Sequence, residues 1–226
     1  MPLSLLTPVE AQRAIYIDFE GFKDESPSFM GWVWAVGKKA SDDNIACIHD
    51  IHKVELHPVI DEYTPSLPGI KHYEQRDYSL SQSINDLARR AFQQERRIVS
   101  WSTHEINKVA EAELEDELLE MFRVNYRDGK VTAKAWFKQL GEDTSNQSNK
   151  LVRYLERANY PLTEDYGLGQ TTKRLKSVIS GLDTKGSWSQ LLSSQKNNWE
   201  NLLLHNFVDC HGLRHVVKLA ANTING

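Results

Sequence analysis

The chain has 226 residues, of which 40% are hydrophobic and 26% charged, a composition typical of a soluble globular protein and not of a disordered chain. Its net charge of −4 excludes a protein that coats nucleic acid by bulk positive charge. Cys47 and Cys210 form no CxxC pair, no apolar stretch approaches the roughly 20 residues that span a bilayer, and the first ten residues lack signal-peptide features. We therefore expect one domain, residues 1–226, in the cytoplasm and without a membrane partner.

Hydrophobic patterning predicts strands in the first quarter of the chain. Residues 13–19 predict one strand, the aromatic and β-branched segment 29–36 a second, and the loosely alternating segment 45–56 a third. Three consecutive strands favour an antiparallel meander. Residues 58–69 contain three prolines and a glycine, which predicts a loop.

The remainder of the chain predicts helices around one further strand. Apolar residues at helical spacing predict a helix over 79–94, and a short strand over 97–101 is followed by a predicted helix from 103 to about 123. Later helices are expected over 145–158, over 172–179 and, with a long apolar stripe, over 199–221. Strands that alternate with helices predict an α/β domain, with a mixed sheet flanked by helices.

The first predicted strand ends in two carboxylates, Asp18 and Glu20, followed at once by a glycine. Side chains two apart on a strand share a face, so these acids project together while Ile15, Ile17 and Phe19 face the other way. Adjacent carboxylates repel each other and are costly to bury, and a divalent cation such as Mg²⁺ or Mn²⁺ removes that cost. An exposed acidic strand end is the alternative interpretation.

A third acid, Glu105, follows the short strand at 97–101 and falls in the first turn of the next predicted helix. The spacing of Ser102 and Glu105 is typical of a capping box, in which the carboxylate accepts from the Ser102 backbone N–H. The segment therefore supports two interpretations, a helix cap and a site carboxylate.

The final predicted helix carries a histidine and an acid, His205 and Asp209, which lie four apart and share a face. An acid within a long apolar helix needs solvent, an N–H donor or a metal as partner. A polar helix edge with a His–Asp pair is the alternative.

A glycine turn at 169 leads into a basic predicted helix. A helix N-terminus of this kind can hold a phosphate, and Lys176 could add a positive charge.

In their order and spacing, these motifs resemble those of the DEDD superfamily of 3′–5′ exonucleases, which has the ribonuclease-H-like fold. Asp18-Phe19-Glu20 matches the first motif, Glu105 the second and Asp209 the third. The closest likeness is to the YprB-type predicted ribonuclease-H-like nucleases, whose last helix carries Tyr-Asn-x-x-Asp-Cys. Here residues 205–210 read His-Asn-Phe-Val-Asp-Cys, after Arg-Leu-Lys at 174–176, and the likeness covers roughly residues 13 to 220. Glu replaces the more common Asp at 105, and His205 stands at the spacing of the family's tyrosine.

The resemblance implies a mixed five-stranded sheet and a nuclease, expected to be a 3′–5′ exonuclease on single-stranded DNA or RNA ends. It implies two Mg²⁺ or Mn²⁺ ions roughly 3.5–4 Å apart. The implied ligands are Asp18, which would bridge the ions, and Glu20, Glu105 and Asp209. The alternatives are a structure-selective endonuclease and a non-catalytic nucleic-acid or protein interaction module on the same scaffold.

Two further roles follow from the same comparison. His205 is the candidate general base, since an imidazole accepts protons near neutral pH, and His104 and His211 are nearby alternatives. Lys176 is the candidate phosphate contact.

Overall fold

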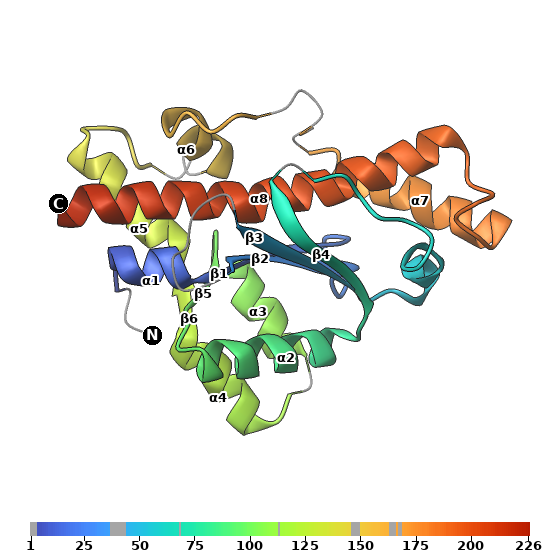
Figure 1. Ribbon diagram of the computed structural model, residues 1–226, viewed down its shortest axis with the longest axis horizontal. Helices are drawn as coiled ribbons and strands as arrows, with labels where there is room; N and C mark the ends of the chain where they lie inside the picture. Colours follow the sequence, from blue (N-terminus) through green and yellow to red (C-terminus); the bar gives the residue numbers. More distant parts are fainter. Residues whose placement is uncertain are drawn as a thin grey trace.

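A six-stranded mixed sheet forms the centre of the protein (Figure 1). The structure is a computed structural model that describes residues 4–36, 44–67, 69–112, 114–145, 150–162, 166 and 169–226. The strand order is β4-β3-β2-β1-β5-β6, and β2 alone runs against the others, because it pairs antiparallel with both β1 and β3 while the remaining pairs are parallel. The strands are β1 (Ile15–Glu20), β2 (Phe29–Ala35), β3 (Ile45–Ile51), β4 (Ile70–Asp77), β5 (Ile98–Ser100) and β6 (Tyr126–Asp128).

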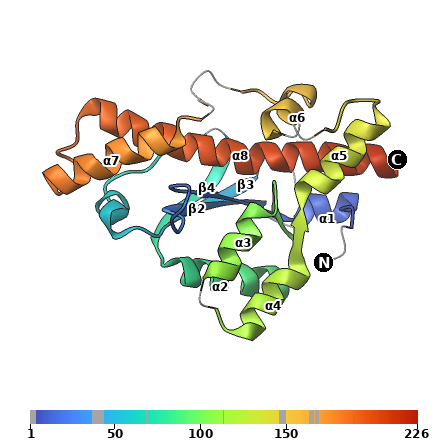
Figure 2. The same ribbon diagram turned by 180° about the vertical axis from the view of Figure 1, so that it is seen from behind.

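Helices cover both faces of the sheet (Figures 1 and 2). One face packs against α1 (Pro8–Arg13), α5 (Gly129–Gln139) and the long α8 (Ser193–Asn225), and α6 (Leu151–Arg157) packs on α8 on the side away from the sheet (Figures 1 and 2). The other face packs against α2 (Leu80–Gln93), α3 (His104–Glu111) and α4 (Asp116–Asn125). A third apolar cluster joins α7 (Thr171–Lys185) to α8 and to the 3₁₀ helix η1 (Val54–Val59).

The alternation predicted for the first strand is confirmed. Ile15 and Ile17 pack in the cluster on the α2 side, and Phe19 lies against it, whereas Tyr16 belongs to the cluster beneath α8. Asp18, which shares the face of Tyr16, is therefore directed toward α8.

The antiparallel meander of β1, β2 and β3 is also confirmed, but the prediction of five strands is wrong. The third strand ends at Ile51 instead of continuing to 56, and η1 follows it. β4 went unpredicted because it is an edge strand in which most side chains are partly or fully exposed, so it shows no clear apolar alternation. β6 has only three residues, too few for a recognisable pattern.

The predicted helices are largely present, with different boundaries. The single helix expected from 103 to about 123 is two helices, and the acidic residues Asp116 and Glu117 occupy the first turn of the second, where the helix dipole favours them. The helix expected from 145 begins at Leu151, and residues 146–149 lie outside the described part of the chain. Within the described residues, no helix combines the length and the apolar character needed to cross a membrane.

Candidate metal centre

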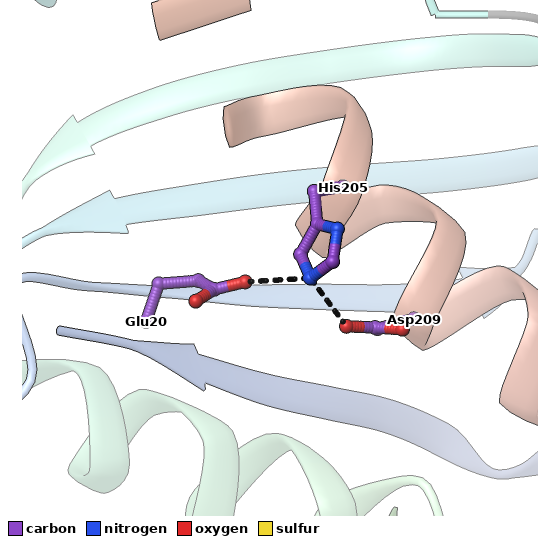
Figure 3. Close-up of side chains that lie close together, drawn as sticks. All are labelled: Glu20, His205 and Asp209. Atoms are coloured by element: carbon purple, nitrogen blue, oxygen red, sulfur yellow. Dashed lines mark ion pairs between the residues drawn. The ribbon is translucent and has the colours of Figure 1, made fainter. Parts of the chain in front are cut away.

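The acids predicted from three separate segments meet where the central strands β1 and β5 end, at the carboxyl ends of these two parallel strands. Asp18, Glu105 and Asp209 line one cavity of about 420 Å³, together with His205. Glu20 lines a smaller neighbouring cavity of about 170 Å³. Figure 3 shows the Glu20 carboxylate directed toward His205, with a distance of 3.9 Å from Glu20 Oε1 to His205 Nε2.

Strand pairing and helix periodicity account for this convergence. β1 and β5 are parallel neighbours, so the segments that follow them leave the sheet at the same edge. Asp18 and Glu20 end β1, and Glu105 lies in the first turn of the helix that follows β5. His205 and Asp209 are one turn apart on α8, which packs across β1 and β2.

The surroundings of three of the carboxylates raise their pKa values and so disfavour the ionised forms. Burial raises the pKa of Asp18 well above its usual value, and the charges of Glu20, Asp209 and Glu105 raise it further. Burial and the charge of Asp209 likewise raise the pKa of Glu20. Burial also raises the pKa of Asp209, although the His205 charge and a hydrogen bond from Tyr166 act in the opposite direction. A bound cation would remove the mutual repulsion that these shifts express.

His205 is oriented by a residue that the sequence did not indicate. Its Nδ1 lies 2.6 Å from the backbone oxygen of Tyr166, and a carbonyl oxygen only accepts, so Nδ1 carries the hydrogen. Nε2 lies 3.2 Å from Asp209 Oδ2, a contact that is an ion pair when the imidazole is protonated (Figure 3). The Tyr166 ring stacks on the imidazole, with 4.6 Å between the ring centres, and the Tyr166 hydroxyl donates to Asp209 Oδ1. A hydrogen bond from one ring nitrogen to a backbone carbonyl fixes the orientation of an imidazole and directs the other ring nitrogen into the site.

The donor set fits a divalent cation. Ligand atoms from Glu20, His205 and Asp209 all lie within 4.8 Å of one another. Carboxylate oxygens are the ligands preferred by Mg²⁺ and Mn²⁺. Together with the raised pKa values of Asp18 and Glu20, this arrangement supports the metal-site interpretation over an exposed acidic strand end.

Glu105 faces the cavity and does not form the capping box that its sequence spacing suggested. α3 begins at His104 with Thr103 in the N-cap position, and no side-chain cap is present there. The Ser102 hydroxyl donates to Glu105 Oε2 at 3.2 Å, so the serine holds the carboxylate itself. Glu105 is 7% exposed and lines the cavity that contains Asp18.

The cavity wall adds positive charge and aromatic surface. Lys130, Lys150 and Trp101 line it, and Lys130 Nζ lies 5.9 Å from the centre of the Trp101 ring. Gly169, just before α7, lines the cavity as well. Lys176 is exposed on α7 and is not among the lining residues, so its contact with phosphate stays a prediction.

The two other histidines considered as bases are less well placed or not described. His211 Nδ1 is engaged with the Tyr160 hydroxyl at 2.8 Å. The side chain of His104 lies outside the described residues.

Comparison with known proteins finds no match: no family model, no curated protein and no solved structure matches this chain. The likeness to DEDD exonucleases thus remains a resemblance of short motifs. The chemistry of the site itself carries the functional proposal.

Proposed function

We propose that this protein is a metal-dependent nuclease with a ribonuclease-H-like domain, acting as a 3′–5′ exonuclease on single-stranded DNA or RNA. The observation that carries the proposal is the meeting of four carboxylates and one oriented imidazole at a single sheet edge. An acidic cluster of this kind is costly unless it binds a cation, and phosphodiester hydrolysis is a reaction that two such cations support.

The protein's own residues divide into ligands and a proton acceptor. Asp18, Glu20, Glu105 and Asp209 would hold two Mg²⁺ or Mn²⁺ ions, which when bound supply charge neutralisation and activation of the attacking water. His205 would accept the proton at Nε2, because Nδ1 is already committed to the Tyr166 carbonyl. Asp209 Oδ2, at 3.2 Å from Nε2, would then stabilise the imidazolium.

The cavity wall suits a nucleotide. Lysines attract phosphate, and base stacking on aromatic side chains contributes to single-strand binding without sequence preference. Lys130, Lys150 and Trp101 therefore offer both kinds of contact beside the acids. The volume of about 420 Å³ falls in the range of roughly 300–1,000 Å³ typical of small-molecule sites, which favours one unpaired nucleotide.

Mn²⁺ binding and cleavage test the proposal together. Saturation with Mn²⁺ to 100 times its Kd should raise the Tm of the wild type by roughly 5–10 °C. Asp209→Asn should abolish both this shift and the stepwise shortening of 5′-labelled single strands. Asp183→Asn, which changes an exposed acid on α7, serves as the matched control and should leave both unchanged.

The remaining outcomes would contradict the proposal in different ways. Internal cuts in place of a stepwise ladder would indicate an endonuclease. The absence of both a Mn²⁺ shift and cleavage in the wild type would indicate a non-catalytic interaction module.

A further inference from the structure

Asn206 of α8 packs on the sheet beside the candidate metal centre, over β2 and between side chains of β1 and β3. Asp18, Gly31 and His49 are direct register partners on β1, β2 and β3, so they lie side by side across the sheet. The central glycine has no side chain, and Asn206 occupies the space above it. A Cβ on Gly31 would lie only 1.6 Å from Asn206 Oδ1. The approach of Asn206 therefore requires glycine at this position.

The hydrogen bonds of Asn206 fix which way its amide points. Nδ2 lies 3.0 Å from Asp18 Oδ2 and 3.1 Å from the Asp18 backbone oxygen, and only an NH₂ group can donate to both. Oδ1 is thereby turned to His49, with 3.2 Å to Nε2, and must accept from it. His49 Nε2 consequently carries the ring hydrogen.

The same reasoning extends to β4. With the hydrogen on Nε2, His49 Nδ1 is an acceptor, and the Tyr73 hydroxyl at 3.0 Å donates to it. The series runs in one direction, from Tyr73 through His49 and Asn206 to the Asp18 carboxylate. We call these first three residues the Asp18 relay.

The ring of His49 remains neutral, which keeps the direction of the series fixed. His49 and Asn206 are fully buried. Burial lowers the pKa of His49 to about 3, although the bond to Asn206 acts in the opposite direction. Both ring nitrogens are engaged, so the described contacts leave His49 with a supporting role and not that of a ligand.

We propose that the Asp18 relay of Tyr73, His49 and Asn206 is a positioning device that holds the Asp18 carboxylate in its metal-binding orientation. This inference rests on the proposed function. Asp18 is the acid whose charge interacts with all three others, so a rotation of its carboxylate would disturb the whole centre. Residues that do not touch the metal but hydrogen-bond to its ligands typically matter: removing one lowers metal affinity or activity by roughly 10–100-fold.

The first test needs neither metal nor activity. ¹⁵N NMR of histidine-labelled wild type should show His49 as the neutral Nε2–H tautomer throughout pH 5–8. The Nδ1–H tautomer, or a ring that becomes charged within this range, would overturn the proposal.

The second test measures Mn²⁺ affinity by calorimetry. Asn206→Ala and His49→Phe should weaken binding roughly 10–100-fold, and His49→Gln, which keeps a donor, should recover part of that loss. Asn198→Ala is the matched control, because Asn198 also makes a side-chain bond from α8, at 3.1 Å to Ser177 on α7, and its loss should leave Mn²⁺ affinity unchanged.

The outcomes separate the two proposals. No Mn²⁺ binding by the wild type would overturn the proposed function itself. Binding by the wild type with an affinity that changes less than threefold in Asn206→Ala and His49→Phe would overturn the relay alone. If Asn206→Ala does not fold, His49→Phe and the NMR measurement still decide.

Discussion

Individual carboxylates at this sheet edge work against the stability of the metal-free protein. Asp18 and Glu20 both have raised pKa values, which means that the folded protein opposes their ionised forms. Residues selected only for stability would avoid such a cluster, and functional sites are where this cost is commonly found. The raised pKa values, together with the close approach of Glu20, His205 and Asp209, therefore support a functional site without any likeness to a family.

A substitution of Glu105 tests the role of its negative charge separately from that of its size and hydrogen bonding. Glu105→Gln keeps an oxygen that can accept from Ser102 but removes the negative charge. We expect cleavage with saturating Mn²⁺ to fall by orders of magnitude, with a change in the free energy of unfolding of about 1 kcal/mol or less. Ser102→Ala, which removes only the hydroxyl, should reduce cleavage far less. Cleavage by Glu105→Gln within a few-fold of wild type would remove Glu105 from the ligand set.

Local periodicity explains which site residues could be predicted from the sequence. Asp18 and Glu20 share a face because a strand alternates, and His205 and Asp209 share one because a helix turns. Tyr166 and Asn206 act through contacts with residues far away in the chain, such as the bond from Asn206 to Asp18, and no local pattern encodes these. Lys130 and Lys150 reach the cavity for the same reason, whereas Lys176, chosen for its place in a motif, does not line it.

At the scale of elements, β4 is a strand that is stabilised by tertiary contacts and that the sequence pattern does not predict. Arg76 on β4 binds Asp50 on β3 through Nε at 2.5 Å and Nη2 at 2.8 Å, and its guanidinium lies 4.6 Å from the Trp32 ring on β2. It also binds Asp86 on α2 at 2.6 Å. A buried, paired arginine thus fixes an otherwise exposed edge strand, and this depends on partners that periodicity cannot reveal.

The packing of α8 on β2 gives a prediction at the same scale. Gly31→Ala should destabilise the protein strongly, by roughly 1–3 kcal/mol or more, because the new Cβ collides with Asn206. In Gly31→Ala/Asn206→Ala the colliding atoms are gone, and the nearest atom to the new Cβ is His49 Cδ2 at 3.1 Å. The double variant should therefore be more stable than the sum of the single effects, as measured by urea unfolding. Additive losses would show that Asn206 does not fill this space.

At the scale of the whole molecule, the distribution of charge matters more than its sum. A net charge of −4 would repel a polyanion, yet Lys130 and Lys150 stand on the wall of the cavity that holds the acids. Two bound divalent cations would neutralise the four carboxylates and leave the positive charge of the two lysines, so we expect affinity for nucleic acid to depend on the metal.

Stability should depend on pH through the same acids. Since the pKa values of Asp18, Glu20 and Asp209 are raised on folding, the folded state binds more protons than the unfolded state above about pH 4. The metal-free protein should therefore lose stability as pH rises from this value toward the folded-state pKa values. His49 and His52, with pKa values lowered to about 3 and about 4, act in the opposite direction below about pH 6.5, so a comparison between variants is needed.

Asp18→Asn supplies that comparison, because it keeps the size of the side chain and removes one charge while both histidines stay in place. Without metal, its Tm should exceed that of the wild type at pH 8, by about 2–4 °C for each kcal/mol of relieved repulsion, and the difference should shrink toward pH 5. With saturating Mn²⁺ the order should reverse, because the wild type gains binding free energy that the variant has lost. Differential scanning fluorimetry across this pH range measures both effects. A Tm difference that does not vary with pH would show that the pKa of Asp18 is not raised in the metal-free protein.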